Sequence, residues 1–331
     1  MNKHINPGEI IVGVIGLGLM GSSIAVSLLI AGHEVNAIAP LQEDLAGAPE
    51  RIKNHLAHCE NSGLLCKPAD AYMAQLTISE DYAVLKPCHV VLECVIEIPD
   101  IKSVVYKKIE SVVTPETIIA SNTSAIPISE LQKLLSRPER FLGIHWAEPS
   151  YLTRFMEITC GDQTSSKYAD WIFELAHQWG KEPTMLRKDI RGFVTNRLMY
   201  AVYREGFSLV EKGDATLEEV DKAFRYDAGS WMTLIGLFRR MDFLGLKDYP
   251  EIFKNIFPAL CNDKHVPALM QKMIEQKAKG TQNLKGLYQY SAEDARKLEE
   301  AFSLFNEDIY QLAMLYPSAR ENVSSVITSD I

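Results

Sequence analysis

The stretch IIVGVIGLGLMGSSIAVSLLIAGHEV, residues 10–35, decides the fold of this chain. The apolar run over residues 10–15 predicts a buried strand, and the apolar pattern over residues 24–31 predicts a helix that ends at Gly32. Between the two lie three glycines with the spacing G-x-G-x-x-G, namely Gly16, Gly18 and Gly21. A strand, a glycine turn and a helix in this order are the context in which the motif indicates a dinucleotide site.

Each part of the glycine turn has a physical role. Gly16 allows the tight turn, Gly18 lets a pyrophosphate approach the backbone, and Gly21 lets the helix pack close to the strand. The start of the helix, with Leu19 and Met20, presents free N–H groups and a partial positive charge to the phosphates. We therefore expect these five residues to bind the dinucleotide.

A membrane segment is the alternative for this stretch. Residues 10–31 carry no charged side chain and are long enough to span a bilayer. Only Lys3 and His4 precede them as positive groups, and no A-x-A cleavage site follows cleanly. Three glycines at dinucleotide spacing favour the cofactor site, so we expect no membrane partner.

Composition agrees with a globular enzyme. The chain has 331 residues, enough for two domains, with 47% hydrophobic and 23% charged residues. Its net charge of −9 gives no basic surface for nucleic acid. The six cysteines, at positions 59, 66, 88, 94, 160 and 261, form no C-x-x-C pair and no zinc-spaced cluster. We expect reduced thiols, a cytoplasmic location and no metal site.

Strand and helix patterns alternate over residues 1–189. Strands are expected at residues 33–39, 76–78, 89–95, 117–121, 141–145 and 154–159. Helices are expected at residues 41–73 (with a break at Gly63), 101–113, 128–135 and 168–179. This order predicts an α/β fold, a doubly wound (Rossmann-type) parallel sheet that forms the dinucleotide-binding domain.

Residues 190–331 have almost only helical periods and predict an all-α C-terminal domain. Helices are expected at residues 197–212, 217–224, 269–279 and 292–315. Thr216 and Glu219 form a capping box before the second of these. Residues 197–212 have more apolar positions than one contact with the sheet domain needs, which favours a homodimer through this domain. The active site is expected in a cleft between the two domains.

The chain contains, in order, motifs that resemble those of the L-3-hydroxyacyl-CoA dehydrogenase family: GLGLMG, ECVIEIPDIK, IIASNTSAIPISEL, RFLGIHWAEP, FMEI and RGFVTNRL. The segment REGFSLVEKGDATLEEVDKAFRYDAG resembles the C-terminal domain of that family. The likeness covers residues 10–246, and the chain beyond Tyr249 matches no motif. HWAEPSYL and FVTNRLMYAV are closer to the lambda-crystallin type, which is similar to L-gulonate 3-dehydrogenase.

The resemblance implies hydride transfer to NAD with His145 as the base. His145 ends a predicted strand, where the sites of open α/β sheets form, and imidazole can accept and return a proton near neutral pH. The family glutamate that matches Glu157 accepts a hydrogen bond from this histidine and orients it. A hairpin-like return of the chain would bring the two side chains together. Taken singly, His145 would be interpreted as a core histidine with satisfied hydrogen bonds and Glu157 as a solvated strand residue.

Five further residues take their roles from the resemblance alone. It places Ser124 at the substrate oxygen, Asn122 beside the nicotinamide and Asn196 at the reacting oxygen or the histidine. Glu97 and Lys102 match a glutamate and a lysine near the nicotinamide ribose and the substrate. Without the resemblance, S-N-T-S is an ordinary turn, and Glu97 and Lys102 form an exposed charge pair of little energetic value.

Two positions depart from the expected pattern. A dinucleotide fold usually has Asp or Glu at the end of its second strand for the adenosine ribose, but Ala39 stands there, followed by Pro40. We expect NAD, with NADP as the second possibility. Glu148 replaces the asparagine that the family has three residues after the histidine. This carboxylate would repel the phosphates of an acyl-CoA or pair with a cationic substrate.

Three functions follow from the sequence. The first is an NAD-dependent 3-hydroxyacyl-CoA dehydrogenase of fatty-acid metabolism. The second is the same chemistry on a small 3-hydroxy acid without coenzyme A, such as a sugar acid or a carnitine-like compound. The third is a catalytically weak dinucleotide-binding protein of the crystallin kind. The first two differ in the need for a basic groove, and Lys102, Lys107 and Lys108 are the few cations near the motifs.

Overall fold

The computed structural model describes residues 6–312. The chain divides into two compact units, Met1–Asn196 and Arg197–Ile331. Asn196 is therefore the last residue of the first unit, which also contains the other predicted catalytic residues. The end of the helix expected at residues 292–315 lies outside the described residues.

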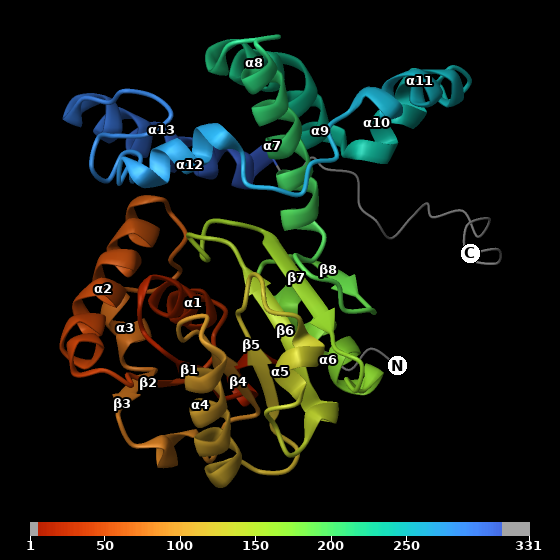
Figure 1. Cartoon of the computed structure of the whole chain (residues 1–331). Helices are drawn as coiled ribbons and strands as arrows, with labels where there is room; N and C mark the ends of the chain where they lie inside the picture. Colours follow the sequence, from red (N-terminus) through yellow and green to blue (C-terminus); the bar gives the residue numbers. More distant parts are fainter. Residues whose placement is uncertain (1–5, 313–331) are drawn as a thin grey trace. The chain divides into compact units, whose positions relative to one another are not determined.

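The first unit contains an eight-stranded sheet with the order β3-β2-β1-β4-β5-β6-β7-β8 (Figure 1). Its strands are β1 (Val12–Ile15), β2 (Val35–Ile38), β3 (Leu76–Ser79), β4 (Val90–Glu93), β5 (Ile118–Ser121), β6 (Phe141–Trp146), β7 (Phe155–Cys160) and β8 (Glu182–Leu186). All neighbouring strands run parallel except β6 and β7, which form the expected antiparallel return. The doubly wound fold is confirmed, and β8 is an addition that the sequence patterns did not predict.

Helices cover both faces of this sheet. They are α1 (Leu19–Ile30), α2 (Gln42–Asn61), α3 (Ala69–Met73), α4 (Pro99–Val112), α5 (Ile128–Gln132) and α6 (Ser166–Gln178). One hydrophobic core joins α1, α2 and α6 to the sheet, and a second core on the other face joins α4 and α5 to it. Alternate residues of β1 illustrate the division, since Val12 and Val14 belong to the first core and Ile15 to the second. Burial on both faces explains the continuous apolar runs in the sequence.

The glycine turn has the geometry that the motif predicts. Gly16 has a φ of 87°, which a residue with a side chain rarely adopts. A Cβ on Gly21 would lie 1.7 Å from the carbonyl oxygen of Gly16, so this position requires glycine. A Cβ on Gly18 would meet no atom within 4 Å, so the backbone there faces open space before the start of α1. The turn therefore leaves room for a pyrophosphate at the helix N-terminus.

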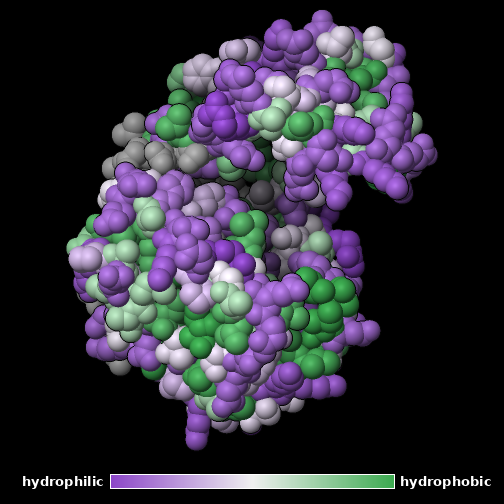
Figure 2. Space-filling view, turned by 90° about the vertical axis from the view of Figure 1, so that its left-hand side faces the viewer, coloured by the Kyte–Doolittle hydropathy of each residue, from purple (hydrophilic) through white to green (hydrophobic). Residues whose placement is uncertain are grey.

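The second unit is built from helices. α7 (Thr195–Lys212) begins in the first unit and continues into the second; the others are α8 (Leu217–Ala223), α9 (Gly229–Ile235), α10 (Leu237–Leu244), α11 (Tyr249–Ile256), α12 (Ala268–Glu275) and α13 (Ala292–Leu312). The capping box of Thr216 and Glu219 is present at α8. Among the described side chains of residues 197–312, only Ser208 and Ala295 are buried. Apolar side chains lie exposed between polar ones on this unit (Figure 2).

No helix within residues 6–312 is both long and apolar enough to cross a membrane. The stretch with no charges, considered above as a possible span, is divided between β1, the glycine turn and the short helix α1. Its apolar character comes from burial, because the side chains at positions 24–29 lie in the interior of the first unit. A buried parallel-sheet unit and a membrane segment thus share the same composition here.

Candidate active site

His145 and Glu157 face each other across the antiparallel pair of β6 and β7. The distance between His145 Nδ1 and Glu157 Oε2 is 3.1 Å. Because an ionised carboxylate only accepts hydrogen bonds, the proton of this bond lies on Nδ1, and Nε2 is left as an acceptor. The rings of Phe155 and Phe193 pack near the imidazole, with ring centroids 5.4 Å and 6.0 Å away. The structure therefore brings together the two side chains that the sequence assigned to proton transfer.

The other oxygen of Glu157 holds the beginning of α7. Its Oε1 accepts hydrogen bonds from the backbone N–H groups of Val194 (3.0 Å) and Thr195 (2.9 Å). Burial raises the pKa of Glu157, but the bonds from His145 and from these two amides outweigh burial and bring the pKa below its usual value. Glu157 is thus ionised near neutral pH and completes a rigid link between β6, β7 and the N-terminus of α7.

The loop after β5 lies next to this pair. Asn122 Oδ1 accepts a hydrogen bond from the backbone N–H of Trp146, the residue after the histidine, at 2.9 Å. The backbone N–H of Ser124 donates to Glu97 Oε1 at 2.9 Å, and its carbonyl accepts a bond of 2.8 Å from Asn196 Nδ2. The exposed Ser124 hydroxyl makes no hydrogen bond to the described residues. Asn196 thus supports the Ser124 loop, and its expected contact with the histidine stays a prediction.

Next to this loop lies a buried polar cluster that the sequence patterns do not predict. Lys102 is 1% exposed and Glu93, at the end of β4, is 0% exposed. Lys102 Nζ lies 2.8 Å and 2.9 Å from the two carboxylate oxygens of Glu93 and 3.4 Å from Glu97 Oε2. Tyr106 and Ser121 donate further hydrogen bonds to Glu93. The alternative interpretation, an exposed charge pair of Lys102 and Glu97, is therefore wrong for Lys102, whose main partner is the buried Glu93.

Replacing Lys102 by methionine is expected to lower the free energy of unfolding by about 3–5 kcal/mol, because the Glu93 carboxylate would stay buried without its cation. Lys107→Met is the matched control, since Lys107 is exposed on the same helix. It should change stability by less than about 0.5 kcal/mol. Urea denaturation at pH 7 measures both variants, and equal stabilities would show that the buried pair makes no net contribution.

Ala39 lies at the expected place but does not face the solvent. It follows β2, is 0% exposed and belongs to the core on the α1 side of the sheet. Ala39 thus stands at the end of the second strand, as predicted, and offers no carboxylate to an adenosine ribose. The first exposed residues after β2 are Pro40 and Leu41. Leu41 and Ile96, which follow the two strands beside β1, are 62% and 59% exposed.

Glu148 lies in the loop between β6 and β7, close to the glycine turn. Burial raises the pKa of Glu148 to about 7, although a hydrogen bond with Ser23 of α1 acts in the other direction. Its Oε2 is buried without a hydrogen-bond partner among the described residues. Ser23 Oγ also accepts a bond of 2.7 Å from the backbone N–H of Ser150, which ties the loop to α1. The departure from the family pattern thus places a titratable group beside the cofactor turn.

Replacing Glu148 by glutamine is expected to stabilise the fold relative to the natural chain, and this gain in stability should be larger at high pH than at low pH. The pKa of Glu148 is raised on folding, so its contribution is favourable below about pH 4.5 and is lost as the pH rises through about 7. The melting temperature of the variant, measured relative to the natural chain, should therefore increase between about pH 5 and about pH 8. Glu116→Gln, an exposed control, should show no such trend. A difference independent of pH would contradict the raised pKa.

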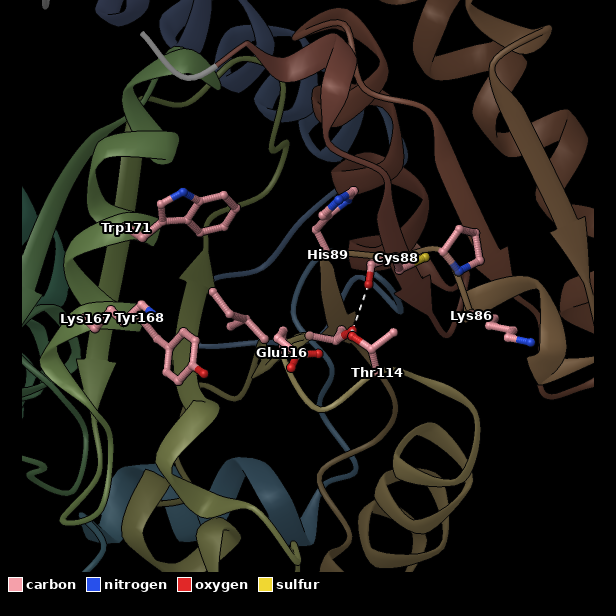
Figure 3. Close-up of a pocket in the computed structure, with 11 residues that line it drawn as sticks. Lys86, Cys88, His89, Thr114, Glu116, Lys167, Tyr168 and Trp171 are labelled. Carbon is pink, nitrogen blue, oxygen red and sulfur yellow. Dashed lines mark hydrogen bonds between the residues drawn. The ribbon is translucent and has the colours of Figure 1, made fainter. Parts of the chain in front are cut away.

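A separate cavity of about 400 Å³ lies at the amino-terminal ends of β4 and β5 (Figure 3). Its walls include Trp171 and Tyr168 of α6 and His89, which directly precedes β4. Most of the predicted site residues, in contrast, lie near the carboxyl ends of the parallel strands, where ligands of open α/β sheets bind: Glu97 follows β4, Ser124 follows β5, and His145 is the last residue but one of β6. This cavity is therefore distinct from the candidate active site. Within residues 6–312, no group of His, Cys, Asp and Glu side chains could hold a metal ion.

Two family models match the chain. Residues 11–190 match the NAD-binding domain of 3-hydroxyacyl-CoA dehydrogenase, and residues 192–290 match the C-terminal domain of the same enzyme family. The matches cover the glycine turn, the His145–Glu157 pair and most of the helical unit. Together with the open backbone at Gly18 and the free N-terminus of α1, they indicate NAD as the cofactor.

Several characterised proteins are similar over most of the chain. 5-Formyl-3-hydroxy-2-methylpyridine 4-carboxylate 5-dehydrogenase of Mesorhizobium japonicum is 31% identical over 294 residues, which cover 87% of this chain and 93% of that protein. L-carnitine dehydrogenase of Staphylococcus epidermidis is 34% identical over 70% of this chain and 72% of its own length. A crystal structure of the pyridine-carboxylate enzyme, described as an NAD+-dependent dismutase, has a TM-score of 0.86 at 27% identity, covering 93% and 99% of the two chains.

Proposed function

Because the chain belongs to the 3-hydroxyacyl-CoA dehydrogenase family, we propose that it oxidises a hydroxyl group on a small carboxylic acid that is not attached to coenzyme A. The chain is an NAD-dependent dehydrogenase. The acyl-CoA thioester is the second candidate substrate, because the family models are named after it. The burial and ion pairing of Lys102 favour the first candidate.

The burial of Lys102 carries the proposal. A coenzyme A diphosphate needs cations at the surface, and Lys102 is the one lysine inside the active-site motifs. It is 1% exposed and its charge is compensated by Glu93, so it is not available to such a ligand. Lys108 lies over the ring of Tyr82, 5.2 Å from the centroid. The ionised form of Glu148, whose side chain is hydrogen-bonded to Ser23 of α1, would disfavour a polyanionic substrate further.

The names of two similar enzymes support the same choice, whereas others, such as the probable 3-hydroxybutyryl-CoA dehydrogenase of Deinococcus radiodurans, are named after acyl-CoA substrates and support the second candidate. One relative acts on a pyridine carboxylate and another on carnitine, and neither substrate name includes coenzyme A. Carnitine also carries a cationic ammonium group, which a carboxylate such as Glu148 would attract. A small acid, zwitterionic or not, therefore fits this chain better than an acyl-CoA.

The geometry supports the following proposed catalytic roles. Glu157 holds the Nδ1 proton of His145, so Nε2 accepts the proton of the substrate hydroxyl. Bound NAD supplies the hydride acceptor for the carbon that carries this hydroxyl. As the carbonyl forms, the hydroxyl of Ser124 donates to the oxygen. The imidazolium is stabilised by the ionised Glu157, and the reverse reaction returns the proton. The intact histidine–carboxylate pair also argues against a catalytically weak crystallin-like protein.

The substrate proposal is tested by following NADH absorbance in both directions. Purified protein is assayed with free hydroxy acids, including sugar acids, L-carnitine and hydroxymethyl-pyridine carboxylates, and with acetoacetyl-CoA in the reverse direction. We expect kcat/KM for at least one free acid to exceed that for acetoacetyl-CoA by more than about tenfold. A preference for acetoacetyl-CoA would establish the second candidate instead.

We also propose that the protein is a homodimer through its second unit, in the cytoplasm. The free cysteines suit a reducing compartment. The exposed apolar side chains of the second unit include Leu198 and Val202 of α7 and Phe238 and Phe243 of α10. A helical unit with so few buried residues needs another surface to cover these side chains.

A dimer is therefore expected in solution at micromolar concentration. Sedimentation velocity measures it directly. Phe238→Asp, at a position that is 79% exposed, should weaken the dimer if the helical unit forms the interface. Lys86→Asp, an exposed change in the first unit, should leave the dimer intact. A monomer of the natural chain at this concentration would contradict the proposal.

A further inference from the structure

We propose that Asp44 sets the preference of this enzyme for NAD over NADP, by neutralising Arg51 at the glycine turn and by supplying the carboxylate that is missing at the end of β2. This inference concerns the cofactor site alone, so it can fail or hold independently of the substrate proposed above. Ala39 stands where a dinucleotide fold usually has its ribose-binding acid, and its buried side chain offers no carboxylate.

Asp44 and Arg51 are connected to the turn by a single nitrogen atom. Arg51 Nη2 donates to the carbonyl oxygen of Leu17, between Gly16 and Gly18, at 2.7 Å. The same Nη2 lies 2.8 Å from Asp44 Oδ1. Both charged residues belong to α2, which begins directly after the exposed residues Pro40 and Leu41. The pair thus connects the glycine turn, which faces the pyrophosphate, with the first turns of the helix that follows β2, the strand whose end usually carries the ribose-binding acid.

The guanidinium of Arg51 is held in this position. A Cβ added to Gly47, in the interior of α2, would lie 2.9 Å from Arg51 Nη1, so the absence of a side chain there lets the guanidinium fold back along the helix. Arg51 Nε is buried and has no partner among the described residues. The side chains of Arg51 and Asp44 are 37% and 22% exposed, so both remain accessible to a ligand. The carboxylate of Asp44 therefore compensates the charge of Arg51, whose guanidinium is held in place and still has an N–H group without a hydrogen-bond partner in the described part of the chain.

NAD and NADP differ only in the 2′-phosphate of the adenosine ribose. An arginine near the end of β2 binds this phosphate in NADP enzymes, and an acid at the same place accepts the ribose hydroxyls of NAD and repels the phosphate. In this chain the arginine is present, but Asp44 occupies its guanidinium and adds a negative charge. Removing Asp44 should leave Arg51 available for a bidentate contact with the 2′-phosphate.

The experiment titrates NADH and NADPH into the full-length protein and follows the fluorescence of the bound nicotinamide, without substrate. For Asp44→Ala, we expect the ratio of the dissociation constants of NADPH and NADH to fall by at least about tenfold. Asp44→Asn, which removes the charge and keeps the size, should change the ratio in the same direction and serves if the alanine variant does not fold. The double variant Asp44→Ala/Arg51→Ala should lose the gain in NADPH affinity.

Glu43→Ala is the matched control. Glu43 is exposed on the same helical turn, carries the same charge and forms no ion pair among the described residues. It should leave the ratio of the two dissociation constants within about twofold of the natural value, because screening weakens an exposed charge that has no direct contact. An unchanged ratio in both Asp44 variants, or an NADPH gain that persists without Arg51, would overturn the inference.

Discussion

Replacing His145 by glutamine is expected to reduce kcat by about 10²–10⁴-fold while NADH affinity stays nearly unchanged, because the loss of a general base acts on the chemical step. His145 Nδ1 is already bonded to Glu157, so Nε2 is the only nitrogen that can accept the substrate proton. Glutamine offers no basic nitrogen at this position. Steady-state NADH formation and NADH fluorescence titration together separate turnover from binding.

The control for this variant is His265→Gln. His265 lies in the second unit, and its side chain is 68% exposed. It should leave kcat within about twofold, as is usual for surface positions away from a site. Natural kcat in the His145 variant would remove this residue from the mechanism, and a parallel loss of NADH affinity would point to a structural defect instead.

Glu157→Gln should cause a loss of similar size, about 10²–10⁴-fold in kcat, for a reason that the hydrogen bonds define. The backbone amides of Val194 and Thr195 both donate to Oε1, so the glutamine oxygen must stay on that side. Its NH₂ group then points at His145 Nδ1 and can only donate. The imidazole would be forced into the opposite tautomer, with its proton on Nε2, where it blocks acceptance of the substrate proton.

The chemical shifts of the ring nitrogens of His145, measured by ¹⁵N NMR, report this tautomer directly. We expect them to exchange their protonated and unprotonated values in the variant, a change that a general loss of stability would not cause. Glu174→Gln, exposed on α6, is the control and should affect neither the shifts nor kcat. Retention of the Nδ1–H form in Glu157→Gln would contradict the proposed role of Glu157.

Local patterns were sufficient to predict most of the fold. The glycine turn, the buried strands and the break of the long helix near Gly63 depend on neighbouring residues, and the structure has them where the sequence indicates. β8 was missed because its burial alternates only partly, as expected for an edge strand. Strand and helix ends differ from the expected ones by a few residues, since they depend on contacts made elsewhere in the chain.

The site was less predictable, because partners far apart in sequence decide what a charged residue does. His145 and Glu157 were paired from the resemblance, and the register of β6 and β7 confirms that they meet. Glu93 has no local signal within an apolar strand, since its donors Lys102, Tyr106 and Ser121 come from later elements. Arg51 likewise gives no local signal, because its partners Leu17 and Asp44 lie 34 and 7 residues before it.

The pairing of β6 and β7 also sets how this enzyme can change over evolutionary time. In an antiparallel pair, one inserted residue inside either strand would turn every later side chain to the other face, and His145 and Glu157 would no longer meet. The connection at residues 147–154 does not set this register, although the hydrogen bond from Ser150 to Ser23 holds part of it against α1. Substitutions at its other positions can therefore leave the pair in place. Glu148 lies within this connection. A lineage can therefore acquire a new substrate by altering this loop while it inherits the proton-transfer pair intact.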